Sequence, residues 1–524
     1  LFRFLPDEIV LLANKAMHSY ESFFKQRGFF TTSYQLPFDQ ALIDQETAWL
    51  KNQLDEASFQ QLMNQNCMLL ATILMKKYIE KTQKQALAEL KSIQFYQPEA
   101  FLLLDAATQK NLDLIKNSFD GSSSYSLFSL IDKAVTPMGS RMIKRWILSP
   151  LIDLEIIKHR QNAVKSFLID HVFFQKVEHL LSGCADMQRI VGRIALEKAL
   201  LSDFVHLGQI LKMVPYLQAL LMLDQSKYLQ TIGCSFKDFS VVQDLLFRAC
   251  NDDAQQEYVI KQGFDAKLDQ MRDLVANASQ KILQLEQEEI VRTGINSLKI
   301  RHNSITGYYL EITKTNAQNL PTDFIEIATL VNRKRYTTKA LQMLQLDILQ
   351  AQQKFQALEK EIFEQVKAQV KLHIHDLRVA SFALAQLDAL LGFAKVSAEF
   401  GWVQPEFHQG QDIMIEQGKH PIVSSLLLEK FIANDTLLSD TQSLWIVTGP
   451  NMGGKSTYLR QVALICLLAQ MGCFIPAKSA KLPILDRIFT RIGAGDFLAQ
   501  GKSTFLIEME ETAQILQYAT KHSL

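Results

Sequence analysis

A glycine-rich segment late in the chain limits the possible folds more than any other feature. It fits the pattern G-x-x-x-x-G-K-[ST], in which backbone N–H groups surround the phosphates of a nucleotide. Side chains at the glycines would block that approach, the lysine places a charge on the outer phosphates, and the serine hydroxyl can bind Mg²⁺. The pattern comprises Gly449, Pro450, Asn451, Met452, Gly453, Gly454, Lys455 and Ser456, with Thr457 next.

The segments on either side agree with this interpretation. "SLWIVTG" before the loop predicts a short, buried, apolar strand, and "STYLRQVALICLLAQMG" after it predicts a helix that stops at Gly472. The loop would then lie between a strand and the N-terminus of a helix, whose positive end attracts phosphate. We therefore expect a nucleotide and Mg²⁺ as cofactors, and the family resemblance given below specifies ATP.

Composition narrows the class of protein. The chain has 524 residues, enough for three or four domains, and 55 Lys plus Arg against 55 Asp plus Glu, so any nucleic-acid site must be local. Six cysteines without C-x-x-C pairing predict reduced thiols, with neither a disulfide framework nor a zinc site. The absence of a long apolar run and of a signal-peptide pattern predicts a soluble intracellular protein, and the two chain ends suggest a fragment.

Periodicity changes along the chain. "ASFQQLMNQNCMLLATILMKKYIEKTQ" is helical, and "FLLLDAATQKNLDL" onward to about residue 261 predicts a helical domain with a loop at Asn117–Ser126. "SLKIRHNSITGYYLEITKT" predicts a hairpin and "FIEIATLV" a further strand. Helical runs at Asp265–Val291 and Lys339–Phe400 flank these strands, so a small β module would lie at the tip of a helical arm. "DIMIEQG" and "ILDRIFTRIG" predict strands of a C-terminal α/β domain.

Several motifs in fixed order resemble the MutS family of DNA mismatch-repair ATPases. They are "TGPNMGGKSTYLRQVALI", "DRIFTRIGAGDFLAQGKSTFLIEMEETAQIL", "LLLDAATQKNLDL", "SLFSLIDKAVTPMGSRMIKRWILSPL", "GKHPIV" and "FIAND". The resemblance covers residues 90 to 524 well and residues 1 to 90 loosely.

The resemblance implies a multidomain fold. Residues 1–90 would be the end of a connector α/β domain and 91–260 a helical core. Residues 261–291 and 339–400 would form lever helices, and 292–338 a β clamp that closes on the DNA backbone. Residues 401–524 would be the N-terminal part of an ABC-type ATPase that works as a dimer.

The resemblance also assigns roles to single residues. Asn451 would contact nucleotide, Phe431 of "FIAND" would pack on adenine, Ser456 would bind Mg²⁺, and Ser503 would reach in trans to the partner's γ-phosphate. The ordinary alternatives are a core aromatic for Phe431 and a helix N-cap for Ser503. Both alternatives stay open.

Basic residues cluster beside the predicted clamp strands at Arg333, Lys334 and Arg335. Such a run is usually a solvated face. At the tip of an arm it can instead provide sequence-independent phosphate contacts, which a protein that scans DNA requires.

Two family elements lack a match. The Phe-x-Glu mismatch reader lies in a domain that would precede this chain, and Phe324-Ile325-Glu326 matches its letters by chance. The Walker B strand is also missing: Asp486 ends "LPILD", but Pro483 interrupts that run and Arg487 stands where a glutamate is needed. Catalytic residues therefore stay unassigned, and we expect ATP hydrolysis only from the longer protein.

The resulting prediction is a mismatch-repair ATPase that binds mismatched double-stranded DNA, switches between scanning and clamp states with ATP, and recruits a MutL-type factor. It would be a homodimer, without a membrane partner, in the bacterial cytoplasm near the nucleoid. The alternatives are a MutS paralogue acting on branched DNA, or a structural or nucleotide-binding ATPase without mismatch recognition.

Overall fold

The computed structural model describes residues 8–13, 17–26, 30–83, 100–252, 258–303, 307–427, 430–491 and 504–524. Contacts divide the chain into two units, Leu1–Lys133 with Arg141–Leu168 and Ala389–Leu524, and Ala134–Ser140 with Ile169–Asp388. The predicted range 91–260 thus contributes to both units. The predicted mixture of helical and α/β parts is confirmed, whereas the ABC-type assignment stays a prediction.

The first described segment, residues 8–83, is a small α/β part. Its two strands pair in parallel, and its helices bury Leu50, Leu62 and Ile73 in a shared core. Asp39 and Asp55 start two of the helices by accepting hydrogen bonds from Leu42 N and Ser58 N. The elements are β1 (Ile9–Leu12), α1 (His18–Gln26), β2 (Thr31–Tyr34), α2 (Gln40–Gln53), α3 (Glu56–Met63) and α4 (Asn66–Gln83).

The second unit begins as a helical bundle. The longest helix of this part, α11, packs against α9, α10, α12 and α13 and buries one face from Phe204 to Leu221. The bundle contains α9 (His171–Ser182), α10 (Met187–Ala195), α11 (Leu201–Leu223), α12 (Lys227–Cys234) and α13 (Ser240–Ala249).

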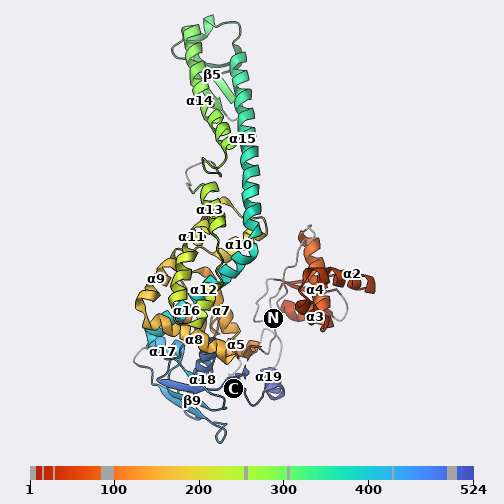
Figure 1. The fold of residues 1–524 in the computed structure, drawn as a ribbon, viewed down its shortest axis with the longest axis vertical. Coiled ribbons are helices and arrows are strands. Elements are labelled where there is room, and N and C mark those ends of the chain that lie inside the picture. The colour runs from red at the N-terminus through yellow and green to blue at the C-terminus, as the bar shows by residue number, and fades with distance from the viewer. Residues whose placement is uncertain are drawn as a thin grey trace. The chain divides into compact units, whose positions relative to one another are not determined.

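Two long helices then form an arm, α14 (Ala266–Thr293) and α15 (Lys339–Leu372), which run side by side in Figure 1. Asp265 caps the start of α14, Gly294 ends it in the left-handed conformation at φ 68°, and Thr338 caps α15. The predicted helical arm is therefore confirmed.

The predicted β module lies at the end of this arm (Figure 1). Its four strands are ordered β4-β5-β7-β6 and are antiparallel throughout. Leu310, Ile312 and Tyr336 on one face join Leu341 of α15 in a core. The strands are β4 (Lys299–Asn303), β5 (Gly307–Thr313), β6 (Ile325–Thr329) and β7 (Arg333–Thr337), with the 3₁₀ helix η3 (Lys314–Asn319) after β5.

Helix α16 (Ile374–Phe400) follows α15 after His373 and passes from the second unit into the first. Among the described residues it is the one helix long and apolar enough to cross a membrane, but 78% of its apolar window is buried inside the protein. Such burial is expected of a core helix.

A carboxylate of α16 fixes the start of α7 (Pro137–Leu148). Asp388 Oδ1 accepts a hydrogen bond from Val135 N at 2.9 Å, and Oδ2 accepts from Thr136 N at 2.8 Å and Thr136 Oγ1 at 2.5 Å. Asp388 is fully buried, and a Cβ at Gly139 would lie 2.1 Å from its Oδ2. The glycine of "TPMG" therefore leaves room for this carboxylate.

The remainder of the first unit contains a four-stranded sheet, ordered β10-β9-β11-β8, and a separate parallel pair, β12-β3. This pair joins "FLLLD" near residue 103 to "DRIF" near residue 487. The elements are β3 (Leu103–Leu104), α5 (Ala106–Asn111), α6 (Leu127–Ile131), α8 (Leu154–Ile169), β8 (Glu406–Phe407), β9 (Ile413–Gly418), α17 (Pro421–Leu427), β10 (Asn434–Leu438), α18 (Lys455–Met471), β11 (Ser479–Leu482), β12 (Arg487–Ile488) and α19 (Thr504–Tyr518).

The helix after the glycine-rich loop, α18, is buried on all sides from Gln461 to Met471. Gly472 ends it at φ 84°, as predicted. A Cβ at Gly472 would lie 2.5 Å from Cβ of Arg160, whose Nη1 donates to Met471 O at 3.0 Å. The guanidinium of Arg160 also stacks 3.7 Å from the ring centre of Trp146. The C-terminal end of α18 is thus held by α7 and α8.

One predicted element is wrong. Residues 443–449, "SLWIVTG", form no strand, and Leu444 and Ile446 are 79% and 85% exposed. Within the described ranges no strand pairs with this segment. An apolar central strand requires hydrogen-bonded neighbours and cover on both faces, and local sequence cannot supply either.

Candidate nucleotide and nucleic-acid sites

The glycine-rich loop closes tightly before α18. Gly453 N donates to Pro450 O at 3.1 Å, and a Cβ at Gly453 would lie only 3.0 Å from that oxygen. Gly454 precedes the helix at φ 82°, and Met452 has φ 66° although it is not a glycine. Met452 is fully exposed. The backbone of the loop is therefore curved, with its side chains outside.

Lys455 lies across this loop. Its Nζ donates hydrogen bonds to Gly449 O and Pro450 O, each at 2.8 Å. The ammonium group is thereby held against the backbone of the first two residues of the loop, and a phosphate bound by this loop would require such a cation.

The first helical N–H groups point from α18 toward the same place. The hydrogen-bond ladder of α18 begins with Tyr458 N to Gly454 O, so the N–H groups of Lys455, Ser456 and Thr457 precede it. Ser456 is exposed beside them. This arrangement fits the phosphates of a nucleotide and a bound Mg²⁺. It combines the curved loop backbone, the Lys455 ammonium group, the free N–H groups at the start of α18 and the Ser456 hydroxyl.

Tyr458 connects the loop helix to the predicted adenine-binding segment. Its hydroxyl lies 2.9 Å from Thr436 Oγ1 and donates to Asp435 O at 3.2 Å. Both partners belong to β10, three residues after the half-buried Phe431. The role of Phe431 against adenine stays a prediction, but β10, the strand that follows it, is fixed to α18.

Asp486 is engaged away from the loop, in the turn at the C-terminal end. It accepts from Thr520 Oγ1 at 2.7 Å and from Ser523 Oγ at 2.8 Å. The interpretation that "LPILD" is not a Walker B strand stays a prediction. Ser503, predicted to act in trans, lies outside the described residues.

The three clustered basic residues do not share one face of the clamp sheet. β7 pairs with β5 so that Arg335 lies opposite Glu311 and Arg333 opposite Thr313, while Lys334 lies opposite Ile312. Successive residues of a strand point to opposite faces. Arg333 and Arg335 therefore lie on the face away from the core, and Lys334 lies on the other.

Lys334 has its own partner, Glu326 of β6. Its Nζ donates to Glu326 Oε2 at 2.8 Å. This hydrogen bond raises the pKa of Lys334 and lowers that of Glu326. A phosphate would have to compete with this carboxylate for Lys334.

Comparison with known families decides where the chain belongs. The model of MutS domain III matches residues 107–394, more than half of the chain, and that of MutS domain V matches residues 445–524. The chain is a member of the MutS family. A DNA mismatch repair protein MutS from Methanothrix thermoacetophila is 37% identical over 454 residues, which are 85% of this chain. The MutS-family chain spans about half the length of that relative, 53%.

Sequence reasoning missed two cations on the outward face of the clamp sheet, Lys299 and Arg301. Arg301 of β4 lies opposite Tyr309 of β5, and its Nε is 3.4 Å from Glu311 Oε1. The alternation in "KIRHN" places Lys299 and Arg301 on one face, which was the available signal.

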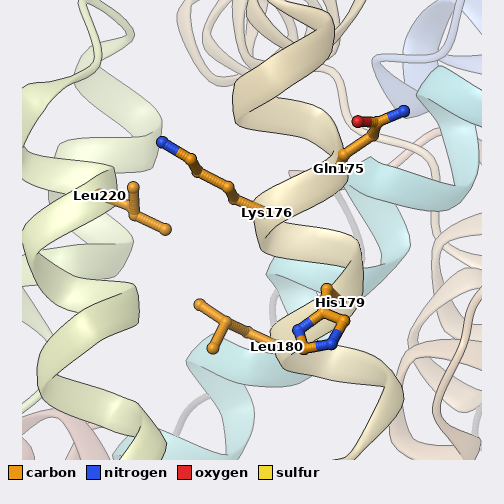
Figure 2. A pocket seen from close by; sticks show the side chains of 5 residues that line it. All are labelled: Gln175, Lys176, His179, Leu180 and Leu220. Carbon is orange, nitrogen blue, oxygen red and sulfur yellow. The ribbon is translucent and has the colours of Figure 1, made fainter.

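Within the described part of the chain, neither the pocket nor the cysteines suggest a further site. Figure 2 shows a shallow depression between α9 and α11, lined by Gln175, Lys176, His179, Leu180 and Leu220, without a convergent charged cluster. Among the described residues, no group of three or more His, Cys, Asp or Glu could hold a metal ion. All six cysteines are free thiols in the structure.

Proposed function

We propose that this chain binds mismatched double-stranded DNA and uses ATP binding and hydrolysis in the longer protein to switch its DNA-binding state. The family match supports the general role in mismatch repair. The observation that carries the nucleotide part is the loop before α18, with Lys455 held by Gly449 O and Pro450 O. In this proposal the protein acts as a homodimer and then recruits a MutL-type factor.

Each polar group of the loop would contact a different part of the nucleotide or its Mg²⁺. The N–H groups of Lys455, Ser456 and Thr457 at the start of α18 would hold the phosphates, and Lys455 would exchange its two carbonyl partners for phosphate oxygens. Ser456 would contribute a hydroxyl to Mg²⁺, which supplies charge stabilisation during phosphoryl transfer. Asn451 and Phe431 would contact the remaining nucleotide.

The deciding experiment is Lys455→Ala in the longer protein. Without the ammonium group we expect nucleotide affinity to fall by at least about tenfold and turnover to be lost, as measured by equilibrium binding of a fluorescent ATP analogue and by phosphate release. A matched control is Lys419→Ala, which removes a lysine just before α17. This variant should retain both nucleotide affinity and turnover. Unchanged ATPase activity in Lys455→Ala would refute the nucleotide assignment.

The DNA proposal rests on the outward face of the clamp sheet. Arg333 is half exposed, and the guanidinium of Arg335 lies 4.3 Å from the ring centre of Tyr309 on the same face. Neutralising Arg333, Lys334 and Arg335 together should lower the affinity for fully paired DNA and for mismatched DNA to the same extent. It should also flatten the slope of log affinity against log salt by roughly one unit per lost contact. Mismatch preference should survive, because phosphate contacts do not read bases.

Single variants separate the three residues. Arg333→Ala should flatten the salt slope more than Lys334→Ala, because Arg333 lies on the outward face and Lys334 lies on the face that carries the core residues. An unchanged slope in the triple variant would mean that the basic run is only a solvated face.

A further inference from the structure

Among the described residues of its four strands, the outward face of the clamp sheet contains one carboxylate and four cations. Register places Lys299 opposite Glu311 across β4 and β5, and Arg335 opposite Glu311 across β5 and β7. Arg301 and Arg333 lie diagonally from Glu311 on the same two neighbouring strands. Leu310, Ile312 and Tyr336 occupy the other face and pack in the core. Glu311 is thus the centre of a charged surface rather than part of the apolar core.

Glu311 lies beneath the guanidinium groups. Its Oε1 is contacted by Arg301 Nε at 3.4 Å and accepts a shorter hydrogen bond from Arg333 Nη1. The Glu311 side chain is 8% exposed, whereas Arg301 and Arg333 are 52% and 50% exposed. The carboxylate is therefore covered while the outer edges of both arginines face solvent.

This geometry leaves the arginines able to bind a second anion. A guanidinium has five N–H donors in a planar fork, and the bond to Glu311 uses only part of them. An anion reaching the face would meet Arg301 and Arg333 from outside, while Glu311 holds them from below. The covered carboxylate cannot itself leave the site without breaking both contacts.

We propose that Glu311 is a built-in counter-ion that limits how strongly Arg301, Arg333 and Arg335 hold the phosphodiester backbone. This inference rests on the proposed binding of DNA by the clamp and adds Arg301 to the phosphate-binding set. Glu311 offsets one positive charge of the face and competes with phosphate for two guanidiniums. A lower affinity for the phosphodiester backbone lets the clamp release DNA more readily. This property suits a protein that must move along any sequence.

The test is a salt titration of the affinity of the 524-residue chain for a fully paired duplex, with and without Glu311→Gln. Glutamine keeps the side-chain size and removes the charge. We expect Glu311→Gln to bind several-fold more tightly at low salt, with a log–log salt slope steeper by about one unit. Arg301→Gln should flatten the slope by about one unit. A slope that stays the same or flattens in Glu311→Gln overturns the proposal.

Two further variants exclude a merely structural effect. Glu311→Asp keeps the charge, so its salt slope should match the wild type; a change equal to that of Glu311→Gln would contradict the proposal. Glu326→Gln removes the carboxylate paired with Lys334 on the opposite face and should steepen the slope less than Glu311→Gln does. An equal steepening in Glu326→Gln would show that any lost negative charge has this effect, and the specific role of Glu311 would fail.

The outcome also separates this inference from the DNA proposal. If Arg333→Ala and Arg335→Ala flatten the slope while Glu311→Gln does not steepen it, the clamp binds DNA and Glu311 is not its counter-ion. If none of these variants changes the slope, both proposals are wrong.

Discussion

At the scale of single residues, His420 shows how burial fixes a protonation state near the loop helix. It is 5% exposed, and its Nδ1 accepts from Val423 N at 3.3 Å, so it caps the start of α17 as a neutral ring. Burial first, and then the positive charge of Arg460, lower the pKa of His420 from 6.5 to about 4. A buried imidazole without a counter-charge is more stable uncharged.

This shift predicts a pH dependence of stability. The unfolded histidine takes up a proton near pH 6.5 and the folded one only near pH 4, so stability is fully present above about 6.5 and declines as the pH falls toward 4. The loss should reach about 3 kcal/mol. Thermal midpoints of wild type and His420→Asn between pH 4 and 7.5 measure it, since asparagine can keep the cap without titrating. Parallel curves for the two proteins would contradict the assignment.

At the scale of elements, the start of α7 depends on one glycine and one aspartate that are far apart in sequence. Asp388 supplies the acceptor for two backbone N–H groups and one hydroxyl, and Gly139 provides the space. Removing either partner should therefore affect the same joint between α7 and α16.

We expect Gly139→Ala to destabilise the fold by about 2–5 kcal/mol, because its methyl group would displace the Asp388 carboxylate. Asp388→Ala should cost about 1–3 kcal/mol for each buried donor left without an acceptor. Because both changes disrupt the same contact, Gly139→Ala should cost less in the Asp388→Ala background. Urea denaturation of the single and double variants measures the coupling, and strictly additive losses would be inconsistent with the contact.

Elements also show what the sequence could predict. Helices α14, α15 and α18 and the β4–β5 hairpin follow from local periodicity and caps such as Asp265, Thr338 and Gly472, which act within one turn. The segment at 443–449 has the composition of a strand but requires neighbours that local sequence does not specify.

For the candidate sites, motif spacing predicted the loop around Lys455. It did not predict which segments contact the helix that follows this loop. The bonds of Tyr458 to Asp435 and Thr436 join segments some twenty residues apart that no periodicity connects. The basic run was visible, yet the faces of Arg333 and Lys334 depend on strand register, which the sequence leaves open.

At the scale of the whole molecule, the resemblance predicts a dimer with shared nucleotide sites. If Ser503 completes the site of the partner subunit, Ser503→Ala should retain nucleotide binding and slow hydrolysis in the longer protein by about 10²-fold or more. Mixing Ser503→Ala with Lys455→Ala subunits should give activity that differs from the sum of the two parents, because one of the two sites in a mixed dimer would be free of either change. Activity equal to the average of the parents at every mixing ratio would indicate independent sites.

The discontinuous first unit has a consequence for the order of events on the ribosome. Residues 169–388 can collapse as soon as they are synthesised, because nearly all of their partners lie within that stretch. Residues 101–168 emerge earlier but must wait, since β3 pairs with β12 and Arg160 holds the end of α18. For some three hundred codons the surfaces that later contact β12 and α18 have no native partner, and nascent chains at this stage are the ones on which we expect chaperones to act.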